Sequence, residues 1–174
     1  MSKKVLCVLP VAQRHKEKLE RAGKDCEFTY VSADAVTDDQ IASAEIIIGC
    51  VPADRIRASE RLELLQLNTA GADPYIVKGV LAEKTVLTNA TGAYSKAVAE
   101  HALASCLMLQ KKLHLYRDAQ KRHEWTDFGT VTSMSDATVL VVGLGDIGRH
   151  FASLCRALGA YTIGVKRRSG EKPD

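Results

Sequence analysis

The sequence predicts an α/β protein, in which a flavodoxin-like doubly wound parallel-sheet domain is followed by the first βαβ unit of a Rossmann domain. Short apolar runs alternate with helical patterns over residues 1–95, which is the order of βαβ units on a parallel sheet. Farther along, the apolar run 138–142 leads into the glycine spacing G-x-G-x-x-G at 143–148 and then a helical pattern. We therefore expect a doubly wound domain at 1–95, a long linking helix and loop at 96–136, and the truncated start of a dinucleotide-binding domain at 137–174.

The composition is that of an ordinary soluble globular protein. The 174 residues are 46% hydrophobic and 26% charged, with a formal net charge of +3. A charge this small, with only 5% aromatic residues, argues against a nucleic-acid partner because it provides neither a basic nor a base-stacking surface. We also expect no membrane partner, since no apolar run reaches the ~20 residues that span a bilayer and no signal-peptide pattern is present.

The cysteines indicate a reducing compartment. All five, at positions 7, 26, 50, 106 and 155, are widely scattered, and no C-x-x-C pair occurs. This pattern is typical of reduced core residues rather than of a disulfide framework or a zinc site. It predicts a cytoplasmic protein without a bound metal.

The elements of the first domain follow from periodicity and turn residues. Strands are expected at residues 5–9, 27–31, 45–50, 64–68 and 85–88. Helices are expected at residues 12–22, after the capping-box pattern at 37–40, near 54–59, and at 74–81. Ligands bind beyond the carboxyl ends of such strands, which favours the loop 68–73 and the segment 89–94. Two interpretations of Ala70 and Gly71 stay open, a plain turn and a nest of backbone N–H groups for a small acid.

One long helix is expected from Ser95 to about His123. Its first half is apolar nearly all round and should be buried, whereas its basic second half should be a solvated face. His101 lies in the apolar half, where a histidine is more often a hydrogen-bonded core residue than a catalyst. The polar stretch 125–136 should be a loop.

The glycine turn has a specific physical meaning. Gly143 allows a tight turn, Gly145 lets a pyrophosphate approach the backbone, and Gly148 lets the helix pack close to the strand. The preceding strand should be buried on both faces, and a second strand should run from Tyr161 to Val165. The N-terminus of the intervening helix would then hold the phosphates. A dinucleotide site is favoured over a merely structural turn because strand, glycines, helix and strand occur in the required order.

The end of the second strand indicates which dinucleotide binds. An NAD site carries an Asp or Glu ~20 residues after the first glycine, to bond the ribose hydroxyl. Here the chain has Lys166, Arg167 and Arg168, followed by Ser169. Cationic side chains suit a 2′-phosphate, and the alternative is a solvated basic strand end. We therefore predict NADP(H) as the cofactor, in preference to NAD(H).

Three motifs occur in a fixed order: LQLNTAGAD at 65–73, TNATGAYSKAVAEH at 88–101 and VVGLGDIG at 141–148. With them the chain resembles the N-terminal part of the D-isomer-specific 2-hydroxyacid dehydrogenases, which include glyoxylate/hydroxypyruvate reductases and phosphoglycerate dehydrogenases. The resemblance implies that the first domain binds substrate. It also implies an oxidoreductase that moves a hydride between NADP(H) and a small 2-oxo or 2-hydroxy acid, and a homodimer for the full-length form.

The resemblance also implies roles for individual residues. The backbone at Ala70 and Gly71 would bind the substrate carboxylate, and Tyr94 would face the active-site cleft where many members have Asn. Lys166 stands where NAD-using members carry the ribose-binding Asp. The residues that match the family's pyrophosphate turn are Gly145, Asp146, Ile147 and Gly148.

The family's catalytic Arg, Glu and His have no match in this chain. Those residues lie beyond the second strand in the family, and His101, His123 and His150 do not occupy the family's position. We therefore expect a fragment that is inactive by itself, with no catalytic residue. The first alternative is a non-catalytic nucleotide-sensing or dimerisation module, similar to the corepressor branch of the fold. A flavodoxin-like or receiver-like domain acting alone is a weaker alternative, because no phosphate-binding loop or paired-aspartate pocket follows the first strand.

Overall fold

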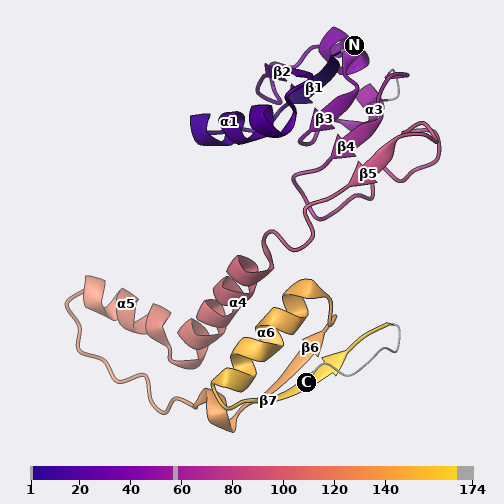
Figure 1. Ribbon diagram of the computed structural model, residues 1–174. Coiled ribbons are helices and arrows are strands. Elements are labelled where there is room, and N and C mark those ends of the chain that lie inside the picture. The colour runs from indigo at the N-terminus through magenta and orange to yellow at the C-terminus, as the bar shows by residue number, and fades with distance from the viewer. Residues whose placement is uncertain (1, 57–58, 168–174) are drawn as a thin grey trace. The chain divides into compact units, whose positions relative to one another are not determined.

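The computed structural model describes residues 2–56 and 59–167. The chain divides into two compact units, residues 1–91 and residues 92–174 (Figure 1). Each unit has its own parallel sheet and its own buried cluster of apolar side chains.

The first unit is built on a five-stranded sheet in the order β2-β1-β3-β4-β5, visible in Figure 1. Its strands are β1 (Lys3–Cys7), β2 (Cys26–Tyr30), β3 (Ile46–Ile48), β4 (Leu64–Gln66) and β5 (Val86–Thr88). The helices are α1 (Gln13–Ala22), α2 (Asp38–Ser43) and α3 (Ala53–Ile56). Every pairing is parallel, and this order is that of a flavodoxin-like doubly wound sheet, so the predicted fold class is confirmed.

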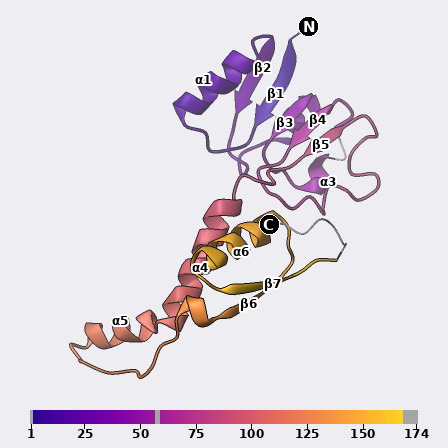
Figure 2. The same cartoon turned by 60° about the horizontal axis from the view of Figure 1, so that its bottom comes forward.

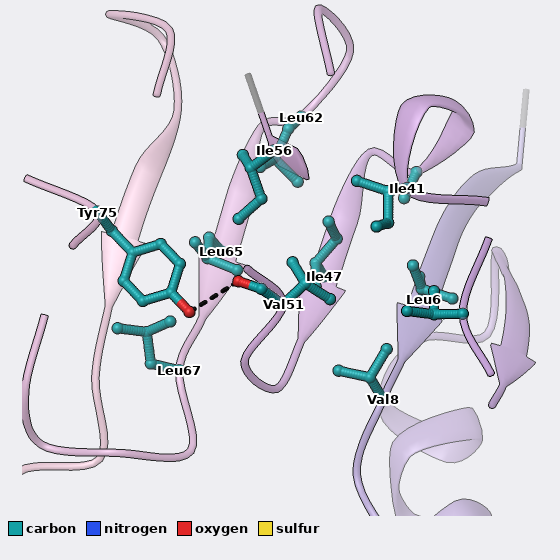
Figure 3. Close-up of a cluster of buried hydrophobic side chains, with 12 residues drawn as sticks. Leu6, Val8, Ile41, Ile47, Val51, Ile56, Leu62, Leu65, Leu67 and Tyr75 are labelled. Atoms are coloured by element: carbon teal, nitrogen blue, oxygen red, sulfur yellow. Dashed lines mark hydrogen bonds between the residues drawn. The ribbon is translucent and has the colours of Figure 1, made fainter. Parts of the chain in front are cut away.

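The core of the first unit lies along the middle strands and the helices that follow them (Figure 3). Ile41 from α2, Ile47 from β3 and Leu65 from β4 are fully inaccessible to solvent. The Tyr75 hydroxyl reaches into this cluster and donates a hydrogen bond of 2.9 Å to the carbonyl of Val51, as Figure 3 shows. The bond satisfies the polar end of an otherwise buried side chain.

The predicted capping box at the start of α2 is confirmed. The Thr37 hydroxyl accepts from the Gln40 N–H at 3.3 Å, and the Gln40 side chain accepts from the Thr37 N–H at 2.9 Å. These reciprocal bonds satisfy N–H groups that a helix start otherwise leaves unpaired. Asp38 and Asp39 occupy the first turn, where negative charge favours the helix dipole.

The helix predicted at 74–81 is wrong. The segment consists of turns and a single bridge between Lys78 and Leu81. The β-branched neighbours Ile76 and Val77 disfavour helix, and Gly79 has a positive φ of 83° that interrupts any helical run.

The second unit contains a two-stranded parallel sheet and the helices that pack on it. Its elements are α4 (Ser95–Gln110), α5 (Leu113–Lys121), the short 3₁₀ helix η1 (Met134–Asp136), β6 (Thr138–Val142), α6 (Asp146–Ala157) and β7 (Tyr161–Val165). Helix α6 lies alongside α4 in both Figure 1 and Figure 2. Met134, Cys155 and Ala160 form the buried cluster, with Leu107 of α4 and Val139 of β6 packed against it. The strands predicted at 138–142 and 161–165 are confirmed.

The single long helix expected from residue 95 to 123 is wrong, because the chain turns between α4 and α5. Lys112 adopts the left-handed conformation, with φ 55°. The side chains at the turn hold a segment that returns to them: Lys111 Nζ donates to the Thr132 carbonyl at 2.6 Å, and Lys112 Nζ donates to the Phe128 carbonyl. These bonds to distant residues offset the strain of a left-handed non-glycine residue.

The apolar half of the expected helix is not buried all round. Only Ser95 and Ala99 of α4 are buried, while Leu109 is 59% exposed. His101 is exposed, so its interpretation as a core histidine is wrong. The reason is that α6 covers one face of α4 and, within this unit, leaves the remaining apolar positions uncovered.

The expectation that β6 is buried on both faces is also wrong. Val141 is buried, but Leu140 is 59% exposed and Val142 is 78% exposed. Leu140 pairs with Ile163, and Val142 with Val165, so these four side chains share one face of the sheet, called here the outer face. No element among the described residues covers it.

All five cysteines are free thiols. Cys7 and Cys155 are buried as expected, but Cys106 is exposed, so the interpretation of every cysteine as a core residue is wrong at that position. No helix in the described ranges is long and apolar enough to cross a bilayer.

Candidate functional site

The glycine turn connects the carboxyl end of β6 to the start of α6. Gly143 has φ 104°, a conformation that L side chains rarely adopt, and its N–H donates to the Val165 carbonyl at 2.8 Å. Gly145 is the N-cap residue of α6, and its carbonyl accepts the first helical bond, from the Arg149 N–H at 3.0 Å. The turn therefore reverses the chain directly above the sheet edge.

The first amides of α6 are free to bind an anion. Among the described residues, the N–H groups of Asp146, Ile147 and Gly148 donate to no backbone acceptor. A helix N-terminus of this kind presents several N–H donors and the positive end of its dipole to one point in space. Such a cradle suits a phosphate group.

Gly145 and Gly148 have different surroundings. A Cβ added at Gly145 would meet no atom within 4 Å, so the space beside the turn is open. A Cβ at Gly148 would lie 2.0 Å from the carbonyl oxygen of Gly143, so no side chain fits there. Gly148 therefore allows the close packing of helix against turn that the sequence predicted, while the role of Gly145 in ligand approach stays a prediction.

The side chain of Asp146 is engaged within the protein. Its carboxylate accepts a hydrogen bond from the Ser95 hydroxyl at the start of α4 and lies 3.6 Å from His150 Nε2. Asp146 and His150 are four residues apart on one helix, a spacing from which their contact could have been predicted. No local pattern in the sequence indicates the contact with Ser95. The Asp146 carboxylate therefore links the turn to Ser95 of α4 and to His150, and its backbone N–H remains available to a ligand. The described residues contain no group of three or more His, Cys, Asp and Glu side chains that could hold a metal ion.

The basic residues follow β7 at the same sheet edge as the glycine turn. Val142 pairs with Val165 in parallel register, so Lys166 and Arg167 leave the sheet beside the turn that begins at Gly143. Both side chains are exposed, and neither forms an ion pair with a described residue. Arg168, the third predicted cation, lies outside the described residues.

In the loop after β4, the carbonyl groups of residues 69–71 each accept a hydrogen bond. The Thr69 carbonyl accepts from the Ala90 N–H at 2.9 Å. The Ala70 carbonyl accepts from Asn89 Nδ2 at 2.8 Å. The Gly71 carbonyl accepts from the Thr69 hydroxyl at 3.0 Å. Within the described part of the chain, the N–H groups of Ala70 and Gly71 donate to no protein acceptor, so two adjacent amides remain for a ligand.

The predicted site residues are divided between the two units. Ala70 and Gly71 are exposed in the first unit, and a Cβ added at Gly71 would meet no atom within 4 Å. Tyr94 belongs to the second unit, where it is the N-cap residue of α4 and is 52% exposed. The glycine turn, Lys166 and Arg167 are together at one sheet edge of the second unit.

Residues 103–174 match the family model described as "D-isomer specific 2-hydroxyacid dehydrogenase, NAD binding domain". A D-3-phosphoglycerate dehydrogenase of Mycobacterium bovis is 30% identical over 114 residues, which cover 65% of this chain and 22% of that protein. A family protein from Aeromonas salmonicida has a similar structure, with a TM-score of 0.82 at 22% identity, covering 99% of this chain and 56% of that one. D-lactate dehydrogenase from Aquifex aeolicus, complexed with NAD and lactic acid, matches with a TM-score of 0.80 at 21% identity. The match covers 97% of this chain and 53% of that one.

The chain thus spans little more than half of the structural relatives and about a fifth of the mycobacterial one. The solved structures show the fold, a doubly wound parallel sheet followed by a Rossmann-type unit. The family model matches the residues that form the glycine turn. Residues 103–174 thus resemble the NAD-binding domain of the D-isomer specific 2-hydroxyacid dehydrogenase family, and the chain is similar in sequence to phosphoglycerate dehydrogenases of that family.

Proposed function

We propose that this protein functions as an NADP(H)-dependent oxidoreductase that transfers a hydride between the dinucleotide and a small 2-oxo or 2-hydroxy acid. The observation that carries the proposal is the placement of free helix N–H groups and two exposed cations at one sheet edge. The phosphates of a dinucleotide match that arrangement in both charge and hydrogen-bond chemistry.

In this proposal, each part of the edge has its own role. The pyrophosphate lies in the open space beside Gly145, on the N–H groups of Asp146, Ile147 and Gly148. Gly143 supplies the turn that makes the approach possible. The basic residues Lys166, Arg167 and Arg168 would bind the 2′-phosphate of the ribose, where an NAD-specific site requires a carboxylate.

The loop at Ala70 and Gly71 would bind the carboxylate of the acid. Its two free N–H groups form an anion-binding nest, and the open space beside Gly71 leaves room for the ligand. Tyr94 would line the substrate cleft. When bound, the dinucleotide supplies the hydride, and reduction of a 2-oxo acid also requires a proton donor and a cation near the carbonyl. The 174 residues contain no match to the family's Arg, Glu and His, so this chain contributes binding groups rather than the acid.

Binding of NADPH and NADH to the 174-residue chain, measured by fluorescence titration, tests the cofactor assignment. We expect NADPH to bind more tightly, and K166A/R167A to lose about tenfold or more in NADPH affinity because charge-assisted bonds to the 2′-phosphate are removed. NADH affinity should be unchanged in that variant. K84A, which removes an exposed cation in the other unit, is the control. A preference of the unmodified chain for NADH would overturn the assignment.

We also propose that the protein forms a homodimer. Apolar side chains on α4, on α5 and after it are exposed within the second unit, including Leu109, Leu113 and the fully exposed Trp125. Burial of such side chains is the usual source of association free energy. Light scattering coupled to size-exclusion chromatography on the protein tests this, and a monomeric mass would contradict it. The cytoplasmic location expected from the scattered cysteines stays a prediction.

A further inference from the structure

We propose that Asn89 is a positioning residue for the acid-binding loop, and that it sets the direction of the Gly71 N–H. The inference rests on the proposed role of Ala70 and Gly71 in binding the substrate carboxylate. It adds a side chain that touches no substrate atom and acts through the peptide group that does.

The argument begins with the geometry of the peptide bond. In a planar trans peptide, the C=O of one residue and the N–H of the next point in opposite directions. A hydrogen bond that holds the Ala70 carbonyl therefore also fixes the direction of the Gly71 N–H. Likewise, a bond to the Thr69 carbonyl fixes the Ala70 N–H.

Both of these carbonyls are held by the segment after β5. The Ala90 N–H holds the Thr69 carbonyl at 2.9 Å, which is a backbone contact that any residue could make. The Ala70 carbonyl is held at 2.8 Å by Asn89 Nδ2, which depends on the side chain. Asn89 thus controls the peptide group before Gly71, where the flexible glycine would otherwise let the loop rotate.

The side chain of Asn89 is itself fixed in place. Its Oδ1 accepts from the Thr91 N–H at 3.2 Å, while its Nδ2 donates to the Ala70 carbonyl. An asparagine satisfies both contacts because its Cγ carries both an acceptor, Oδ1, and a donor, Nδ2. Aspartate would keep the acceptor and lose the donor, and leucine would lose both.

Thr69 supports the far side of the same loop. Its hydroxyl donates to the Gly71 carbonyl at 3.0 Å and lies 3.6 Å from the Cys50 thiol. The Gly71 peptide is therefore held on one side by Asn89 and on the other by Thr69. In this proposal, the hydrogen bonds to all three loop carbonyls keep them from turning toward the bound carboxylate, which a carbonyl oxygen would repel.

The test is an NMR titration of the ¹⁵N-labelled 174-residue chain with pyruvate, using methyl pyruvate as the analogue without the charge. We expect the Ala70 and Gly71 amide resonances to shift with pyruvate only. N89D and N89L should weaken pyruvate binding by about tenfold or more, since one of the two N–H donors loses its alignment. T69V should weaken binding, and T69S should restore it.

T88V provides the matched control, because the Thr88 hydroxyl donates to Gln66 Oε1 at 2.8 Å and to the Leu65 carbonyl at 3.4 Å, and both acceptors lie in β4 rather than in the loop. It should change the pyruvate affinity by less than about twofold. N89D and N89L affinities equal to that of the unmodified chain would overturn the role of Asn89. Absence of any shift at Ala70 and Gly71 in the unmodified chain would instead overturn the proposed acid site on which the inference depends.

A second measurement does not depend on the stability of any variant. In the unmodified chain, a scalar coupling across the hydrogen bond between Asn89 Nδ2 and the Ala70 carbonyl carbon should be detectable. The Asn89 side-chain amide protons should also exchange slowly with solvent. Fast exchange without such a coupling would show that the amide does not hold the loop, and would overturn the inference.

Discussion

At the scale of single residues, the glycine turn of the second unit contains one glycine that a Cβ would disrupt and one that has room for it. A Cβ at Gly148 would meet the Gly143 carbonyl at 2.0 Å, whereas at Gly145 it would meet only open space. Glycine is therefore required for packing at one position and leaves open space at the other. The sequence spacing predicted the close packing at Gly148, because it follows from the backbone path of the G-x-G-x-x-G pattern, and the proposed ligand access at Gly145 stays a prediction.

Gly148→Ala should destabilise the second unit by about 1–3 kcal/mol, because the added methyl overlaps a backbone oxygen that has little freedom to move. Gly145→Ala should leave the unfolding free energy nearly unchanged and weaken NADPH binding, since its methyl occupies the space proposed for the pyrophosphate. Urea unfolding followed by circular dichroism, together with NADPH titration, separates the two effects. Equal stabilities for both variants would contradict this assignment.

Tyr75 is the residue through which the core of the first unit should respond to alkaline pH. Burial, followed by the nearby Cys50 thiol, raises its pKa from the ordinary 10.0 to about 12. The folded state therefore favours the neutral phenol. Its contribution to stability is complete below pH 10 and is lost as the pH rises from about 10 to about 12.

Tyr75→Phe should lower the free energy of unfolding at neutral pH by about 1 kcal/mol, because it removes the bond to the Val51 carbonyl. It should also make the loss of stability between pH 10 and 12 smaller. The remaining loss would come from Tyr30, because burial raises the pKa of Tyr30 to about 12 as well. Urea unfolding at several pH values measures both effects. An unchanged pH dependence would refute the role of Tyr75.

At the scale of elements, local signals set helix starts more reliably than they set helix lengths. The capping box at Thr37 and Gln40 is complete, because both partners lie within one turn of each other. The break between α4 and α5 has no comparable local cause. It depends on Lys111 and Lys112 reaching Thr132 and Phe128, which are far along the chain.

Thr37→Ala should therefore cost about 1 kcal/mol of unfolding free energy, because the Gln40 N–H loses its acceptor at the start of α2. Thr37→Ser retains the hydroxyl and should retain most of the stability. Urea unfolding of the three proteins at neutral pH provides the comparison. The interpretation fails if the alanine and serine variants are equally stable.

At the scale of the whole molecule, the chain contains the two surfaces that we propose bind ligands, and no residue in it matches the family's acid–base group. The loop at Ala70 and Gly71 belongs to the first unit, and the glycine turn belongs to the second. The outer face of β6 and β7 is apolar and uncovered by any described residue. A surface of this kind is typical of one that packs against further structure.

We expect the 174-residue chain to bind NADPH but to show negligible reduction of glyoxylate or hydroxypyruvate. The reason is that hydride transfer to a 2-oxo acid needs a proton donor, and no residue here matches the family's Arg, Glu and His. Loss of NADPH absorbance at 340 nm in the presence of either acid measures the activity. Robust turnover by the purified chain would contradict the expectation.

The sequence by itself determined the fold class, the positions of β6 and β7, the capping box and the glycine turn. These depend on the conformations of neighbouring residues and on short, regular spacings, which a sequence displays directly. Only the tertiary structure decided that 74–81 is not a helix, that α4 and α5 are separate, and that Leu140 and Val142 are exposed. Only the structure showed the hydrogen bonds between Asn89 and Ala70 and between Ser95 and Asp146. These features depend on which distant segments meet, and hydrogen bonds and burial between residues far apart in the chain leave no local pattern.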